Sequence, residues 1–160
     1  MATITIKNID RLMHRLNKIS NIDLTDKVNR ATTLVHAQAK SLAPVDTGDL
    51  AGSIHMEVKK KEQTVEGRVF TNKQYAPFVE FGTGIKGNGT YPYKIKGFSL
   101  AYRDTRWCYT PDGGETFIWT KGQVAQPYMY PALSRNRKAI KQILNEGVKE
   151  KIQKHCKGGQ

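Results

Sequence analysis

The spacing of apolar residues predicts helices in the first third of the chain. From Ile9 to Ile19, apolar residues recur every three or four positions, which predicts a short amphipathic helix after a brief extended start. A second helix is expected to begin at Asp23 or Thr25, whose side-chain oxygens can cap it, and to end before Pro44, which lacks a backbone donor. Its apolar face is expected to contain Leu24, Val28, Ala31, Leu34 or Val35, Gln38 and Leu42.

Further along the chain, the period changes from helical to alternating. Apolar and polar residues alternate over residues 54–59 and again over 65–70, which predicts two antiparallel strands joined around residues 61–63. Two later segments, 98–109 and 115–120, are separated by a Pro-Asp-Gly-Gly turn sequence. They are expected to form a second hairpin or a long ordered loop.

The apolar pattern becomes helical again after Pro131, where a basic and aliphatic run predicts a closing helix. Helices at both ends with strands between them predict an α+β fold, in which N-terminal helices and a C-terminal helix pack on a mostly antiparallel sheet. A length of 160 residues suits one domain. We expect this domain to span residues 1–157, with 85–121 as an extended loop or hairpin insertion and 158–160 as a flexible tail.

Composition is consistent with a folded chain, since 38% of the residues are hydrophobic and 9% are aromatic. The N-terminal residues lack the apolar run of a signal peptide, and no stretch approaches the roughly 20 apolar residues of a membrane span, so we expect a soluble, cytoplasmic protein without membrane contacts. Cys108 and Cys156 lie in very different contexts, and we interpret both as free thiols.

The formal net charge of +12 predicts attraction to polyanions, either nucleic acid or acidic protein surfaces. The positive residues concentrate in the predicted first hairpin turn and in the closing helix. The simplest interpretation is a solvated helix face and hairpin tip, and the alternative is contact with DNA phosphates. The candidates for such contacts are Lys59, Lys60, Lys61, Arg135, Arg137, Lys138 and Lys141.

Three local motifs interrupt the regular pattern, and each has a purely structural explanation as a turn or a helix boundary. Residues 43–50, with the sequence Ala-Pro-Val-Asp-Thr-Gly-Asp-Leu, end a helix and reverse the chain. Residues 75–84, with the sequence Tyr-Ala-Pro-Phe-Val-Glu-Phe-Gly-Thr-Gly, place large apolar side chains beside one acid and then break at glycine. Residues 126–133, with the sequence Gln-Pro-Tyr-Met-Tyr-Pro-Ala-Leu, lead into the last helix.

In this order, the three motifs resemble the tail-component family of siphophages, which is related to minor tail protein Z and to other head–tail joining or tail-completion proteins. The resemblance spans most of the chain, except for residues 85–121, which are longer and more aromatic than the usual connection. It implies a non-enzymatic structural protein without a cofactor. The expected location is the head–tail interface of a phage or prophage virion that is assembled in the bacterial cytoplasm.

The resemblance also implies partners: other neck and tail proteins, and identical subunits that form a ring around the DNA channel. Such a ring requires a heterologous interface, and buried aromatic side chains are enriched at interface centres. The alternative is that these aromatic residues form the core of the chain's own hairpin. The aromatic candidates are Tyr91, Tyr93, Phe98, Tyr102, Trp107, Tyr109, Phe117 and Trp119. Glu80 is a further interface candidate, expected to pair with a Lys or Arg at a subunit or hairpin contact rather than to act as a general base.

Enzymatic interpretations find little support in the sequence. Residues 82–87 match G-x-G-x-x-G, but that motif requires a strand before it and a helix after it, whereas Asn-Gly-Thr-Tyr-Pro follows here. The four histidines lack the ligand spacing of a zinc site, and nothing ties Cys108 to a base, so a packed hydrophobic role is expected for this cysteine. The serious alternative function is a sequence-independent nucleic-acid-binding module that uses the basic closing helix.

Overall fold

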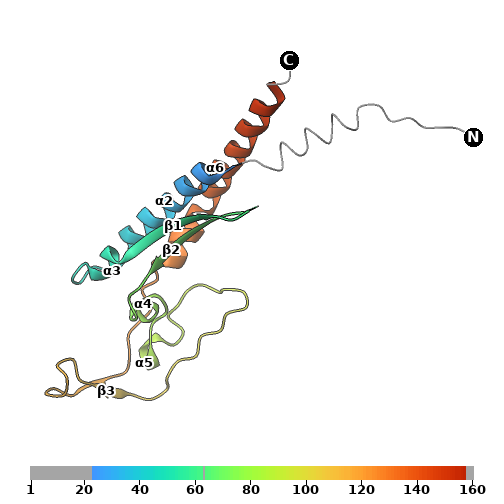
Figure 1. Ribbon diagram of the computed structural model, residues 1–160. Helices are drawn as coiled ribbons and strands as arrows, with labels where there is room; N and C mark the ends of the chain where they lie inside the picture. Colours follow the sequence, from blue (N-terminus) through green and yellow to red (C-terminus); the bar gives the residue numbers. More distant parts are fainter. Residues whose placement is uncertain (1–22, 63, 158–160) are drawn as a thin grey trace, which may run out of the picture. The chain divides into compact units, whose positions relative to one another are not determined.

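The computed structural model describes residues 23–62 and 64–157, which form a mixed α+β structure (Figure 1). The predicted helix at Ile9–Ile19, its extended start and the tail 158–160 lie outside the described residues. The elements, in order, are α2 (Thr25–Leu42), α3 (Asp49–Gly52), β1 (Ile54–Lys60), β2 (Val65–Thr71), α4 (Ala76–Phe81), α5 (Gly84–Gly87), β3 (Trp107–Tyr109), β4 (Ile118–Thr120) and α6 (Met129–Lys157).

The chain divides into two compact units, which we call unit 1 and unit 2. The described residues of unit 1 are those up to Leu34, the hairpin segment Met56–Arg68 and the residues from Asn136 onward. Unit 2 comprises Val35–His55 and Val69–Arg135. A single domain over residues 1–157 stays a prediction.

The α+β class is confirmed, but the strands form two separate two-stranded sheets, β1 with β2 and β3 with β4, instead of one larger sheet. In the second sheet, Trp107 pairs with Thr120, Cys108 with Trp119 and Tyr109 with Ile118. The predicted second hairpin is therefore much shorter than residues 98–120, because residues 98–106 contribute no strand.

Helix α2 has the predicted boundaries, since it begins at Thr25 and ends at Leu42, two residues before Pro44. The Asp23 carboxylate accepts a hydrogen bond from the Thr25 backbone N–H at 2.9 Å, which satisfies one of the donors left free at a helix start. The most buried stripe differs from the predicted one near the end of the helix, because Ala39 and Ala43 are buried while Gln38 and Leu42 are only half-buried. The stripe is made of small residues at a spacing of four: Ala31, Val35, Ala39 and Ala43.

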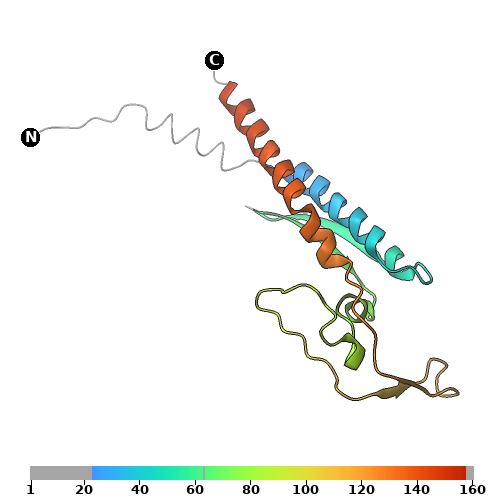
Figure 2. The same cartoon turned by 180° about the vertical axis from the view of Figure 1, so that it is seen from behind.

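In unit 1, two glycines mark the places where α2 meets its neighbours. A Cβ added to Gly67 of β2 would overlap the Thr32 hydroxyl and lie 3.1 Å from Cγ1 of Val28. A Cβ at Gly147 of α6 would lie 3.3 Å from Cδ2 of Leu24. Within unit 1, α2 therefore contacts the hairpin of β1 and β2 with one part of its surface and α6 with another. The opposite views of Figures 1 and 2 both show this arrangement.

The close approach at Gly67 leads to a prediction for the stability of unit 1. We expect Gly67→Ala to lower the free energy of unfolding by about 1–3 kcal/mol, because the new methyl group overpacks against the β-branched side chains of α2. Thermal unfolding followed by circular dichroism at 222 nm measures the change. Gly52→Ala is the control, because a Cβ there meets nothing within 4 Å. Equal effects of the two substitutions would contradict the packing explanation.

Candidate functional site

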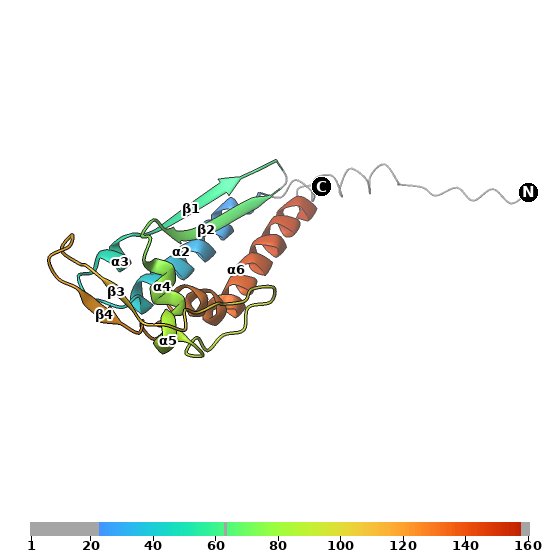
Figure 3. The same cartoon turned by 90° about the horizontal axis from the view of Figure 1, so that it is seen from below.

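A buried carboxylate joins two distant parts of unit 2. Glu80, on α4, is only 4% exposed. Its Oε2 accepts hydrogen bonds from the backbone N–H groups of Tyr128 at 2.7 Å and Met129 at 2.8 Å, and its Oε1 accepts one from Tyr130 at 3.1 Å. The carboxylate of α4 thus caps the N-terminus of α6 from a position almost fifty residues away in the sequence. Figure 3 shows α4 beside the first turn of α6.

This arrangement accounts for every backbone donor at the start of α6. Glu80 takes the N–H groups of residues 128–130, Pro131 has no N–H, and the N–H of Ala132 donates to the carbonyl oxygen of Tyr128 at 3.2 Å. The first turn of α6 contains no acidic residue of its own. Glu80 therefore supplies the negative charge that the positive end of the helix dipole favours.

Within the described part of the chain, the Glu80 carboxylate is bound by backbone N–H groups and not by a Lys or Arg, and its pairing with a cation of another subunit stays a prediction. A buried carboxylate can be compensated by hydrogen bonds as well as by a cation, provided that its oxygens are satisfied. In the sequence, the position of Glu80 between apolar neighbours indicates that this acid is unusual. That position does not reveal which groups bind the carboxylate.

A second link ties the same two segments together through backbone contacts alone. Thr83 and Gln123 form an antiparallel bridge, in which each N–H donates to the other carbonyl oxygen at 2.9 and 3.1 Å. The N–H of Gln126 also donates to the carbonyl of Val79 at 2.8 Å, and the Gln123 side-chain amide donates to the carbonyl of Phe78 at 2.9 Å. Residues 78–83 are therefore fixed against residues 123–130 at several points besides Glu80.

Glycines make this close approach of two backbones feasible. A Cβ at Gly84 would lie 2.6 Å from both the Lys121 carbonyl oxygen and Cζ3 of Trp107. Gly122 has a φ of +93°, and a Cβ there would overlap the carbonyl of Thr83. The pairing of Thr83 with Gln123 was not predicted from the sequence. The cluster of glycines at 82, 84 and 87 was its only signal, and it was considered only as a nucleotide-binding motif.

The structure supports the rejection of that motif, because the short helix α4, not a strand, precedes Gly82. Gly82 and Gly87 instead lie against each other and against Gln123: a Cβ at either position would come within 2.9 Å of the Gln123 carbonyl oxygen. The described residues also contain no group of three or more His, Cys, Asp or Glu side chains that could hold a metal ion.

Part of the predicted aromatic set packs inside unit 2. Phe81 contacts Tyr91 and Phe98, with ring centroids 5.0 and 5.3 Å apart, and Tyr93 contacts Tyr130 at 4.7 Å. The Tyr102 hydroxyl donates to the carbonyl of Phe81 at 2.9 Å. Burial raises the pKa of Tyr91 well above its usual range, and the nearby Glu80 charge raises it further. These tyrosines surround the junction of α4 with α6.

Other aromatic residues of unit 2 line a groove or are exposed to solvent. A hollow of about 890 Å³ is lined largely by apolar side chains of α4 and of the segment leading into β3, among them Phe78, Tyr102 and Trp107. Beyond this groove, Phe117 is 68% and Trp119 64% exposed. The prediction of a packed role for Cys108 is wrong, because this free cysteine is exposed in β3, opposite Trp119.

The two sets of predicted basic residues differ in how their charges are compensated. Each lysine of the first hairpin forms an ion pair within unit 1: Lys59 with Glu57 at 3.0 Å, Lys60 with Asp23 at 2.6 Å and Lys61 with Glu66 at 3.3 Å. The hydrogen bond from Lys60, followed by that from Thr25, holds the pKa of Asp23 well below its usual range. No such partner is found for Lys138, Lys141 or Lys149 of α6 anywhere in the described ranges.

The buried tyrosines predict loss of stability in alkaline solution. Burial, followed by the Glu80 charge, raises the pKa of Tyr128 from 10.0 to about 12. Because the folded state then holds this proton more tightly than the unfolded state, stability is fully present below pH 10 and falls as the pH rises toward 12. We expect Tyr128→Phe to reduce the change in the free energy of unfolding with pH. Urea titrations from about pH 9 to about pH 12, the range in which tyrosines ionise, measure this change. An unchanged slope would contradict this role.

Comparison with known proteins connects these features to a family. Residues 6–82 match the family model described as "Bacteriophage HK97-gp10, putative tail-component". Searches of curated proteins and of solved structures gave no match. No helix among the described residues is long and apolar enough to cross a membrane. The match contains Glu80 but ends at Gly82, so the residues that Glu80 caps lie beyond it. The resemblance seen in the sequence is thus confirmed over residues 6–82, which are similar to the HK97-gp10-like family of bacteriophage tail components.

Proposed function

We propose that this tail component is a ring-forming subunit at the head–tail interface, where it completes the tail and helps to join it to the head. Its partners would be copies of itself and other proteins of the neck and tail. The observation that carries the proposal is the exposed aromatic surface of unit 2. Monomeric proteins rarely leave many large apolar side chains together in solvent, and aromatic residues are enriched at interface centres.

A ring requires two different patches on each subunit, because the first patch of one subunit binds the second patch of the next. Unit 2 offers two patches of opposite shape. One is the hairpin strand β4 with its preceding residue, where Phe117 and Trp119 are more than 60% exposed. The other is the groove of about 890 Å³ that α4 and the residues before β3 line. In the proposed interface, the aromatic side chains of one subunit fill the groove of the next.

The backbone around the groove supports such a contact because it is held in place. Phe78 lies on α4, whose residues are fixed by Glu80, by the Thr83–Gln123 bridge and by the Gln123 side chain. Preorganised surfaces lose less conformational entropy on association than mobile ones. The two-stranded sheet of β3 and β4 also leaves one edge of each strand without a partner among the described residues, which suits addition of a further strand.

The mass of the full-length protein in solution tests this proposal. We expect sedimentation velocity to find one closed oligomer that persists in high salt, because apolar contacts are not screened by ions. The double variant Phe117→Ser/Trp119→Ser removes one patch and Phe78→Ser alters the other, so each is expected to be monomeric. Val45→Ser, at a residue that is 80% exposed and does not line the groove, is the matched control and should keep the oligomer.

Mixing the two variants provides a sharper test of a heterologous interface. One variant retains an intact groove and the other an intact hairpin, so a mixture can form one complete contact and should yield mixed dimers. An interface between identical patches would not be rescued in this way. A wild-type protein that stays monomeric at all concentrations, or variants that assemble normally, would overturn the proposed ring contact.

A further inference from the structure

The exposed side of α6 in unit 1 has a charge that its own surroundings do not compensate. Residues 136–154 contain six Lys or Arg residues and two Glu residues. Of these acids, Glu150 is paired with Lys27 of α2 at 2.8 Å. The other, Glu146, accepts a hydrogen bond from the Gln142 side chain at 3.0 Å. The cations along the rest of this helix are left facing solvent.

Four of these cations form a continuous strip, which we call the α6 basic strip: Arg137, Lys138, Lys141 and Lys149. All four are exposed. Arg137 precedes Lys141 by four residues, Lys138 precedes it by three, and Lys149 follows it by eight, which places all four within about one third of the helix circumference. The lysines extend over about 16 Å of helix axis, given a rise of about 1.5 Å per residue. The three lysines also line a shallow hollow of about 440 Å³, together with Gln142, Asn145 and Glu146.

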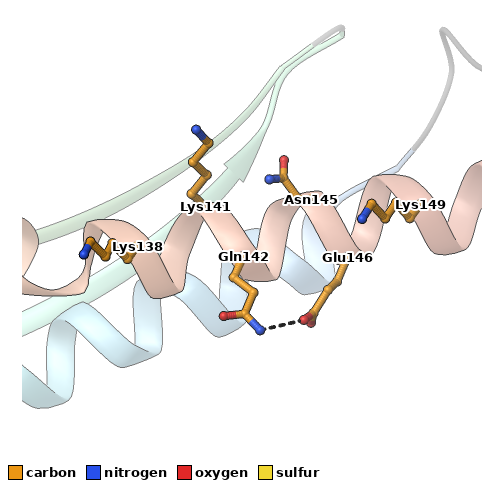
Figure 4. A pocket seen from close by; sticks show the side chains of 6 residues that line it. All are labelled: Lys138, Lys141, Gln142, Asn145, Glu146 and Lys149. Carbon is orange, nitrogen blue, oxygen red and sulfur yellow. Dashed lines mark hydrogen bonds between the residues drawn. The ribbon is translucent and has the colours of Figure 1, made fainter.

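One acid, Glu146, lines the same hollow as the lysines of this strip. Figure 4 shows Lys141 and Asn145 on one side of α6, and Gln142 and Glu146 on the opposite side, joined by their hydrogen bond. The opposite side of the helix packs within unit 1, since the buried Gly147 lies against α2. An amphipathic helix whose apolar face is covered within its own unit presents its polar face to partners.

We infer that the α6 basic strip binds the phosphate backbone of double-stranded DNA without reading its sequence. Duplex DNA carries one negative charge per about 1.7 Å of axis, so a row of separated lysines can meet several phosphates at once. No side chain of the strip is held in a network that would aim it at base edges, as sequence recognition requires. The hairpin lysines differ from those of the strip because each already forms an ion pair with a carboxylate, which competes with phosphate.

Two matched triple variants of the full-length protein test the inference. Lys138→Gln/Lys141→Gln/Lys149→Gln removes three charges from the α6 basic strip, and Lys59→Gln/Lys60→Gln/Lys61→Gln removes the same number from the hairpin. Binding to a 30-base-pair duplex of arbitrary sequence is followed by fluorescence anisotropy between 50 and 200 mM salt. We expect the α6 variant to bind at least about tenfold more weakly and to lose about 2.7 from the slope of log K against log[salt], at 0.9 per phosphate contact.

The control identifies what the lysines do. The hairpin variant should keep most of the affinity and slope, although its net charge has fallen equally. Equal losses in both variants would mean that only net charge matters, and an unaffected α6 variant would place any binding elsewhere; either result overturns the inference. Poly-glutamate of similar length is the competitor, and if it displaces the duplex at equal charge, the strip suits an acidic protein surface instead. These measurements do not depend on ring formation, which the mass of the protein reports separately.

Discussion

Replacing Glu80 by alanine is expected to lower the free energy of unfolding of unit 2 by about 3 kcal/mol. The substitution removes the acceptor of three backbone N–H groups at the start of α6, one of them 2.7 Å from the carboxylate, and the side chain is only 4% exposed. Donors that lose a buried partner cost about 1–3 kcal/mol, and water entering the space recovers part of that loss. The helix N-terminus also loses a favourable negative charge.

Urea unfolding followed by tryptophan fluorescence measures this effect selectively, because Trp107 and Trp119 both lie in unit 2. Glu80→Gln should cost roughly half as much, since its single carbonyl oxygen can still accept two of the three N–H groups. Glu115→Ala is the matched control, because Glu115 is exposed and forms no ion pair within the described residues. A loss at Glu80 no larger than that at Glu115 would refute the capping role.

The second large effect is expected at Gly122, where alanine should destabilise unit 2 by about 3 kcal/mol or more. The backbone there has a φ of +93°, and the new Cβ would overlap the carbonyl group of Thr83. Because that carbonyl accepts the N–H of Gln123 in the backbone bridge, it cannot move aside without breaking the bridge. The two segments joined by this bridge would have to separate to make room for the methyl group.

Gly89→Ala separates the two causes of this effect. Gly89 has a similar φ of +74°, but a Cβ there meets nothing within 4 Å. Its substitution should therefore cost only the backbone strain, about 1 kcal/mol. If both substitutions cost the same, steric exclusion at the bridge contributes nothing. The same fluorescence-detected unfolding measures both variants.

The consequences extend to the proposed interface. Phe78 and Glu80 lie on the same six-residue helix, α4, so a substitution that releases Glu80 from α6 also releases the aromatic side chains that line the groove. An isolated helix of this length has little stability in water. The cap and the backbone bridge are therefore what give the groove a fixed shape.

Much of the secondary structure could be predicted because its causes are local. Three features each depend on residues a few positions apart. They are the alternation of apolar and polar residues over 54–60, the end of α2 at Leu42 before Pro44, and the long amphipathic run that forms α6. The extent of the second hairpin was overestimated for the same reason. Residues 98–106 contain the strand-forming Phe98, Tyr102 and Thr105 but form no strand, and the Tyr102 side chain instead contacts α4 through a hydrogen bond to the carbonyl of Phe81.

The sequence by itself determined the fold class, the resemblance of residues 6–82 to a family of phage tail components, and the positive charge of this protein. Composition, periodicity and the order of the three motifs are properties of the chain that need no coordinates. The tertiary structure decided which charges matter: Glu80 is committed to backbone donors 48 to 50 residues away, and the hairpin lysines are committed to carboxylates, whereas the lysines of α6 are not. The physical reason is that an electrostatic partner is defined by distance in space, which residue spacing fixes only within a single helix or hairpin.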